Sequence, residues 1–300
     1  MSEREGHEFV SSRNLLVTTV LNLAITIAEF IGGLLSNSLA LLSDALHNLS
    51  DTLAILLAYI ANRIAKKASN KRKTFGYKRI EILAAFLNSL VLIVISIFLF
   101  VEAVKRFQDP EPIKGQIMFI VAGIGLLANL FSVLLLRKSS RGNLNIKSAY
   151  LHLIGDTLSS VAVIIGGVLI YFYQIYWVDP VITILIGLYI MKETWHILKK
   201  TVDILMQGVP ESIDVSQIKL ELERTPEVEN IHHVHIWNLS DRIIHFECHA
   251  KLAKDIRVSE TGPVLKKIEH TLRDRFNIRH ITVQFEFNTC DDKETAIHQE

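Results

Sequence analysis

The sequence predicts a membrane α-helical bundle of six spans, followed by a cytoplasmic α+β domain with a ferredoxin-like αββαβ order. Hydrophobic residues make up 50% of the chain and the mean hydropathy is +0.31, which is too apolar for an ordinary soluble domain. Long apolar runs extend to about Ile197, whereas residues 210–300 are rich in Lys, Glu, Asp and His. We therefore expect two domains, residues 1–207 in the membrane and residues 208–300 in the cytoplasm.

Six windows are long enough to cross a bilayer core, which requires roughly 20 apolar residues of helix. They are Leu15–Leu35, Leu39–Ala61, Ile82–Val104, Ile117–Leu136, Ala149–Tyr171 and Val181–Ile197. The last window is short, because Asp179 and Pro180 precede it and Lys199 and Lys200 follow it.

Lys and Arg gather after the second, fourth and sixth windows. Such residues concentrate on the cytoplasmic side of short membrane loops, so these ends and both termini are predicted to be cytoplasmic. The two cysteines, Cys248 and Cys290, lie in the tail, which excludes a disulfide framework and agrees with a reducing compartment. We expect a multi-pass integral protein of the plasma (inner) membrane, in contact with lipid and without a nucleic-acid partner.

Two of the predicted spans contain a His followed four residues later by an Asp. These pairs are His47 with Asp51 and His152 with Asp156, and the spacing puts each pair on one face of a helix. An ionisable group at the bilayer centre costs about 2.5–3.5 kcal/mol or more, so each needs a partner or a function. Two such faces would supply two imidazoles and two carboxylates, the donor set of a tetrahedral zinc site. The alternative is an intrahelical hydrogen bond within each pair, which the recurrence of the spacing disfavours.

Other polar residues in the predicted spans lack this repeated spacing. We expect Glu29 and Asp44 to line a cavity or contact other helices rather than to bind metal. The glycine pairs Gly32-Gly33 and Gly166-Gly167 are typical of close contacts between membrane helices.

The sequence of the tail, residues 208–300, predicts the order helix, strand, strand, helix, strand. The expected elements are Ser212–Arg224, Val228–Asn238, Ile243–Leu252, Val258–Arg275 and Ile281–Phe287. Its candidate metal ligands are His232, His233, His235, His245, His249, Glu286 and Cys290. Strand alternation places His232 and His233 on opposite faces, so we expect that they do not both serve one site. The alternative is that these are ordinary surface histidines on strands.

Four segments carry a family resemblance. They are Asn37–Asp51, Thr74–Glu81, Ala149–Asp156 and Val234–Ser240. On these segments the chain resembles the cation diffusion facilitators, zinc-exporting proton antiporters that work as homodimers.

The resemblance assigns the transport site to His47, Asp51, His152 and Asp156, in the two-His form of the zinc-preferring branch. It also assigns a cytoplasmic metal site to His232, His249 and Glu286, with Gln284 in place of the usual third His. The tail is then a metal-binding and dimerisation domain.

These features predict efflux of a divalent cation in exchange for protons. Zinc is the expected substrate, with cadmium and cobalt as further candidates, and zinc is also a candidate regulatory ligand of the tail rather than a cofactor. The chain has no ATP-binding motif, so a proton or potassium gradient must supply the energy. The alternative is a membrane metal sensor or metalloenzyme with the same ligands. Four protein ligands fill the coordination of zinc, which favours transport over catalysis.

Overall fold

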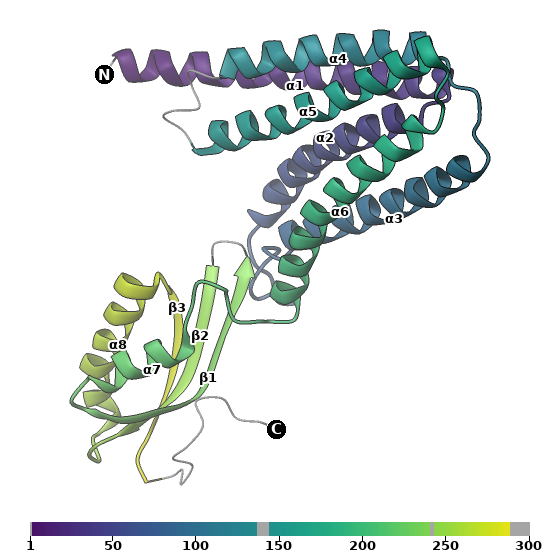
Figure 1. Cartoon of the computed structure of the whole chain (residues 1–300). Helices are drawn as coiled ribbons and strands as arrows, with labels where there is room; N and C mark the ends of the chain where they lie inside the picture. Colours follow the sequence, from purple (N-terminus) through teal and green to yellow (C-terminus); the bar gives the residue numbers. More distant parts are fainter. Residues whose placement is uncertain (1, 137–143, 241–242, 289–300) are drawn as a thin grey trace. The chain divides into compact units, whose positions relative to one another are not determined.

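The chain forms two compact units, which are described separately. The computed structural model describes residues 2–136, 144–240 and 243–288 (Figure 1), with side chains described in 17–135, at 150, and in 153–240 and 243–288. The first unit contains Met1–Leu57 and Leu87–Ile197, and the second contains Ala58–Phe86 and Leu198–Glu300.

Six long helices follow the order that the apolar windows predict. They are α1 (Ser2–Ser36), α2 (Leu39–Ala65), α3 (Ile80–Gln108), α4 (Gly115–Leu136), α5 (Leu144–Tyr173) and α6 (Val178–Leu205). Each predicted window lies within one of them. The sixth was predicted too short, because α6 runs on through Lys199 and Lys200 to Leu205.

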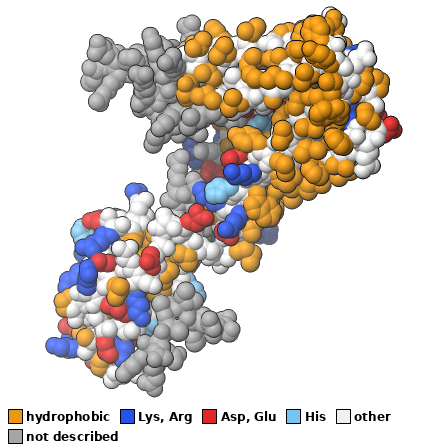
Figure 2. All heavy atoms as spheres, in the orientation of Figure 1, with side chains coloured by type: hydrophobic (Ala, Val, Ile, Leu, Met, Phe, Trp, Pro, Cys, Tyr) orange, Lys and Arg blue, Asp and Glu red, His pale blue; other side chains and the backbone are white. Residues whose placement is uncertain are grey.

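Among the described residues, five of these helices are long and apolar enough to cross a membrane, namely α1, α3, α4, α5 and α6. Helix α2 has 27 residues but is not one of the five, because Asp44, His47, Asn48 and Asp51 lower its hydropathy. In the first unit, hydrophobic side chains cover most of the face that Figure 2 shows. Such a large exposed apolar surface is expected where hydrocarbon, and not water, surrounds the helices.

Glycines allow close contacts between the helices of the first unit, as the sequence predicts. A Cβ on Gly167 of α5 would lie 2.9 Å from the backbone nitrogen of Phe119 in α4. A Cβ on Gly32 of α1 would lie 2.8 Å from the Val121 side chain of α4. Small residues at these positions let the helix backbones approach, which is the main source of helix packing in membranes.

The first turn of α2 is held by a carboxylate from α6. The buried side chain of Asp179 accepts hydrogen bonds from the Ser38 hydroxyl (2.5 Å) and from the backbone N–H groups of Leu39 (2.8 Å) and Ala40 (3.2 Å). These N–H groups have no partner within the helix, and a negative charge is favourable at a helix N-terminus. Asp179 therefore caps α2 from another helix.

The tail has the predicted element order. It contains α7 (Val215–Glu223), β1 (Val228–Ser240), β2 (Ile243–Leu252), a short 3-10 turn η2 (Val258–Glu260), α8 (Thr261–Phe276) and β3 (His280–Glu286). The sheet order is β1-β2-β3, with β1 antiparallel and β3 parallel to β2.

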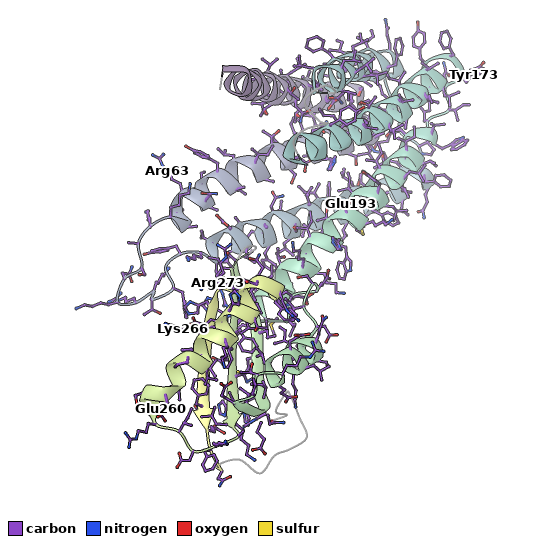
Figure 3. All side chains as sticks on the ribbon, turned by 90° about the vertical axis from the view of Figure 1, so that its left-hand side faces the viewer. Arg63, Tyr173, Glu193, Glu260, Lys266 and Arg273 are labelled. Carbon is purple, nitrogen blue, oxygen red and sulfur yellow. The ribbon has the colours of Figure 1, made fainter. Side chains whose placement is uncertain are left out.

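One face of this sheet packs against the two helices. Ile218 of α7 and Ile268 of α8 are fully buried with Phe246 of β2 in a common hydrophobic core. Lys266 and Arg273 lie on the exposed side of α8 (Figure 3). The second face of the sheet carries His232, His245 and His249.

Replacing Gly167 with Ala should destabilise the first unit. The added methyl group would meet the Phe119 backbone, which cannot move as a side chain would, and overpacking of this kind costs about 1–3 kcal/mol. Gly187→Ala in α6 is the matched control, since a Cβ there meets no atom within 4 Å. Thermal unfolding of both variants in detergent should show a lower midpoint for Gly167→Ala alone. Equal midpoints would contradict the close contact.

Candidate metal centres

Helices α2 and α5 bring three of the four predicted transport-site residues together. The Nε2 atom of His47 lies 3.4 Å from Oδ2 of Asp51 and 3.9 Å from Oδ1 of Asp156. The Asp156 side chain is only 3% exposed, whereas those of His47 and Asp51 are 16% and 27% exposed. His152 lies four residues before Asp156 in α5, but its side chain is outside the described residues.

These separations suit a tetrahedral metal ion. Zinc bound at about 2.0–2.2 Å from nitrogen and oxygen ligands keeps neighbouring ligand atoms roughly 3.4 Å apart. The distance of 3.4 Å between His47 and Asp51 within α2 has this value, and the distance of 3.9 Å between His47 and Asp156 of α5 is slightly longer. One imidazole and two carboxylates are therefore positioned to bind a divalent cation between two helices.

Two further acidic residues hold the helices around this site. The Ser159 hydroxyl of α5 donates to Asp44 of α2 at 2.5 Å, and the Asn48 amide of α2 donates to Glu29 of α1 at 3.1 Å. Both carboxylates thus contact another helix, as the sequence predicts. Gly125 of α4 makes room for Glu29, because a Cβ there would collide with Glu29 Oε1.

The tail brings His232, His249 and Glu286 together on the sheet face opposite the helices. The Glu286 carboxylate lies 3.3 Å from Nε2 of His232 and 2.7 Å from Nδ1 of His249, and the Gln284 amide donates to it at 2.8 Å. Strand register explains this grouping, because His232 pairs with His249, and His249 pairs with Gln284. His232 is 3% exposed and Glu286 is 11% exposed, so these are not ordinary surface side chains.

His233 joins this cluster, and the prediction that it lies on the face opposite His232 is wrong. The register of β1 shifts between His232 and His235, and His233 has a positive φ of 49°. This β-bulge interrupts the alternation, so the ligand atoms of His232, His233 and His249 lie within 4.8 Å of one another. The ring of His233 stacks on that of His249 with 4.6 Å between centroids. A signal was present in the sequence, since the core residues Ile231 and Val234 are three positions apart instead of two.

The remaining candidate ligands lie elsewhere. His235 is exposed. Cys248, which was not a candidate ligand, is buried in the hydrophobic core, where burial raises the pKa of its thiol to about 12. Cys290 is outside the described residues.

His245 belongs to a separate aromatic group. Its ring lies 4.0 Å from that of His280 and 5.3 Å from that of Trp237. Burial lowers the pKa of His245 to about 4, assisted by the positive charges of His280, Lys78 and Arg79. This histidine is therefore neutral at physiological pH.

A His–Asp site between helices of membrane-crossing length, joined to a soluble domain with a second histidine cluster, defines a membrane protein that handles metal cations. Comparison with known families agrees. Residues 15–206 match the cation efflux transmembrane domain, and residues 210–288 match the cytoplasmic domain of cation efflux proteins. The chain belongs to the cation efflux family. It is an integral membrane protein of divalent metal cation efflux with a cytoplasmic C-terminal domain.

Characterised relatives match over nearly the whole chain. The cation efflux system protein CzcD of Alcaligenes sp. (strain CT14) is 39% identical over 97% of this chain and 92% of its own length. The cadmium, cobalt and zinc/H(+)-K(+) antiporter of Bacillus subtilis (strain 168) is 40% identical over 94% and 92%, respectively. The zinc transporter ZitB of Escherichia coli (strain K12) is 37% identical over 96% and 92%.

The neutral state of His245 should make the tail less stable in mild acid. Because the folded pKa is about 4 and the ordinary value is 6.5, only the unfolded chain takes up this proton between those two values. The contribution to stability is complete above pH 6.5 and is lost as the pH falls towards 4. NMR titration of the imidazole signals, with His245→Gln to assign the resonance, should show a ring that stays neutral at about pH 5. A midpoint near 6.5 would contradict this environment.

Proposed function

We propose that this chain exports zinc from the cytoplasm in exchange for protons, through a site formed by His47, Asp51, His152 and Asp156. The observation that carries the proposal is the convergence of His47, Asp51 and Asp156 from two helices, with Asp156 almost fully buried. The names of the E. coli and B. subtilis relatives, a zinc transporter and an antiporter of cadmium, cobalt and zinc, support zinc as the substrate and cadmium and cobalt as further candidates.

Exchange follows from the chemistry of these ligands. Zinc requires neutral imidazole and ionised carboxylate, so metal binding releases protons and protonation releases the metal. Imidazole has a reference pKa of about 6.5, so a histidine site is suited to change state between the cytoplasm and a slightly more acidic exterior. No ATP-binding motif is present in the sequence, so we assign the protein as a secondary active transporter driven by a proton or potassium gradient.

We also propose that all six long helices cross the plasma (inner) membrane, with both termini in the cytoplasm. Helix α2 has 27 residues, or about 40 Å at 1.5 Å per residue, and a bilayer core is about 30 Å thick. The residues that make α2 less apolar include His47, whose Nε2 lies 3.9 Å from Asp156 of α5, and Asp51, which lies beside His47. We keep residues 1–207 and 208–300 as the two domains, the second with ferredoxin-like topology. Two copies would pair as a homodimer.

Removal of a ligand should abolish zinc exchange. Alanine at His47, Asp51, His152 or Asp156 takes away one of four donors, and we expect zinc flux to fall to background. The measurement is zinc uptake into vesicles with an acidic interior and the cytoplasmic side outward. His196→Ala is the matched control, because His196 is exposed on α6. If His152→Ala retained wild-type flux, the assignment of the site would be wrong.

The tail cluster is proposed to regulate transport by binding zinc through His232, His249 and Glu286, with His233 stacked on His249 as the residue that orients it. A soluble domain beyond α6 is outside any path through the bilayer, so its metal acts on transport by coupling, which is typically worth about 1–3 kcal/mol. Buried Glu286 supports this role, because a carboxylate held between two imidazoles is an arrangement that a metal ion would stabilise.

Zinc binding to the tail should survive loss of the transport site. We expect calorimetry on the full chain carrying Asp156→Ala to retain one class of zinc site, which the further changes His232→Ala and His249→Ala remove. His233→Ala should weaken this binding by about 10–100-fold, the loss typical of a residue that orients a ligand. His270→Ala, an exposed histidine of α8, should leave it unchanged. No zinc binding at micromolar concentration would reduce the tail to a dimerisation domain and leave the transport site unaffected.

A further inference from the structure

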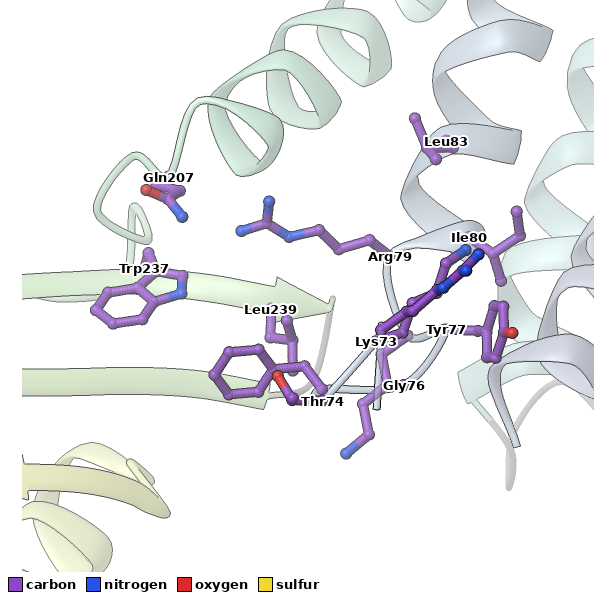
Figure 4. Close-up of a pocket in the computed structure, with 13 residues that line it drawn as sticks. Lys73, Thr74, Gly76, Tyr77, Arg79, Ile80, Leu83, Gln207, Trp237 and Leu239 are labelled. Carbon is purple, nitrogen blue, oxygen red and sulfur yellow. The ribbon is translucent and has the colours of Figure 1, made fainter. Parts of the chain in front are cut away.

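The second unit contains a basic pocket that shares no residue with either histidine site. We use this name for a hollow of about 400 Å³ lined by the segment 72–80 and by Leu83, Gln207, Trp237 and Leu239 (Figure 4). Four of its lining residues are cations, Arg72, Lys73, Lys78 and Arg79, and none is acidic. A pocket lined by four cations and no carboxylate attracts anions.

The loop that forms one wall is held by its own hydrogen bonds. The Asn70 side chain accepts from the backbone N–H groups of Arg72 and Lys73, both at 2.9 Å. Gly76 has a positive φ of 73°, a backbone conformation that glycine adopts readily. The Lys73 ammonium lies 4.4 Å above the Tyr77 ring. The cations are therefore presented by an ordered loop, which lowers the entropy cost of binding a ligand.

The loop is also anchored on the sheet. The Phe75 ring contacts the rings of His245 and His280 edge to face, with centroids 5.1 and 6.1 Å apart. Because His245 is neutral, this contact adds no further positive charge beneath the loop.

The charge of the pocket is not balanced within the described part of the chain. Among the described residues, no carboxylate forms an ion pair with Arg72, Lys73, Lys78 or Arg79. The Nε atom of Arg79 is buried and lacks a hydrogen-bond partner, and its guanidinium group extends towards Gln207 and Trp237 (Figure 4). Buried polar groups are normally satisfied, so an anion at this position would complete the bonding of Arg79.

The pocket adjoins the ends of two membrane helices along the chain. Arg79 immediately precedes the apolar segment Ile80–Gln108, and Gln207 follows the segment Val178–Leu205 by two residues. These helix ends carry the Lys and Arg residues of the cytoplasmic loops, so they lie at the level of the lipid headgroups. Clusters of Lys and Arg at this level bind the anionic lipids of the cytoplasmic leaflet.

We propose that the basic pocket binds a phosphate group, and that the phosphate belongs to the headgroup of an anionic phospholipid. Arg79 supplies a planar pair of donors that matches two phosphate oxygens, whereas Lys73, Lys78 and Arg72 add charge around it. Trp237 and Leu239 form an apolar wall beside the headgroup.

The test uses the full chain in detergent, with Trp177→Phe and Trp195→Phe, so that Trp237 is the remaining tryptophan. Its fluorescence is followed during titration with short-chain phosphatidylglycerol, short-chain phosphatidylcholine or inorganic phosphate. We expect saturable binding of phosphatidylglycerol and much weaker binding of the other two. Arg79→Gln should weaken it about tenfold or more, since a charge-assisted hydrogen bond is lost. Arg79→Lys keeps the charge and loses the paired donors, so its affinity for phosphatidylglycerol should lie between those of the parent chain and of Arg79→Gln.

The control is the double variant Lys66→Gln, Lys67→Gln, which removes two charges from the same loop without touching the pocket. It should bind like the parent chain. If this double variant weakened binding as much as Arg79→Gln does, the lipid would be attracted by the overall charge of the loop, and the assignment to the pocket would be overturned. Equal affinity for inorganic phosphate would retain a phosphate site but overturn the lipid source. No saturable response to any of the three ligands would overturn the proposal. Zinc binding by the tail in each variant shows that the second unit remains folded.

Discussion

The hydrogen bonds between Asp179 and the first turn of α2 determine where that helix begins, and the proposed metal site depends on that starting point. His47 and Asp51 follow this turn within the same helix, so the rotation of α2 about its axis at Leu39 decides which way they face. A second constraint acts on Asn37, two residues before α2 begins at Leu39. Arg106 of α3 donates to the backbone oxygen of Asn37 at 2.6 Å and to its side chain at 2.9 Å. Two polar contacts from different helices thus define one turn, and that turn sets the direction of His47 and Asp51, the two residues of the proposed site on α2.

Polar groups are costly in a membrane, and the structure places two buried carboxylates, Asp44 and Glu29, in contact with another helix. Asp44 bonds to α5, and Glu29 bonds to α2, in the same stretch of helix that carries the ligands. These bonds keep α1, α2 and α5 in contact through groups other than the ligands. The residues of the proposed transport site are consequently not the only polar groups that link these helices, so a change in their protonation state would not remove every polar contact between α1, α2 and α5.

Local patterns in the sequence are sufficient to predict the long helices and the order of the helices and strands in the tail. Runs of apolar residues identify helices directly, and the four-residue spacing of His47 and Asp51 is a property of one helix. The bulge at His233, the cap from Asp179 and the contact of Phe75 with His245 could not be predicted in this way. The cap and the ring contact each depend on a partner far along the chain, which leaves no periodic signal, and the bulge leaves only the three-residue spacing of Ile231 and Val234. The ends of α6 were also misjudged, because its charged last turns continue as helix beyond the apolar stretch.

The bulge in β1 affects more than the position of one imidazole. Strand β1 is an edge of the three-stranded sheet, and edge strands present backbone N–H and C=O groups with which a strand from another molecule can pair. A regular edge of 13 residues would be a template for such pairing, which is a common origin of aggregation. The left-handed backbone at His233 breaks the even row of donors and acceptors near the middle of this edge. The irregularity that adds a third histidine to the cluster thereby also protects the tail from growing into an intermolecular sheet.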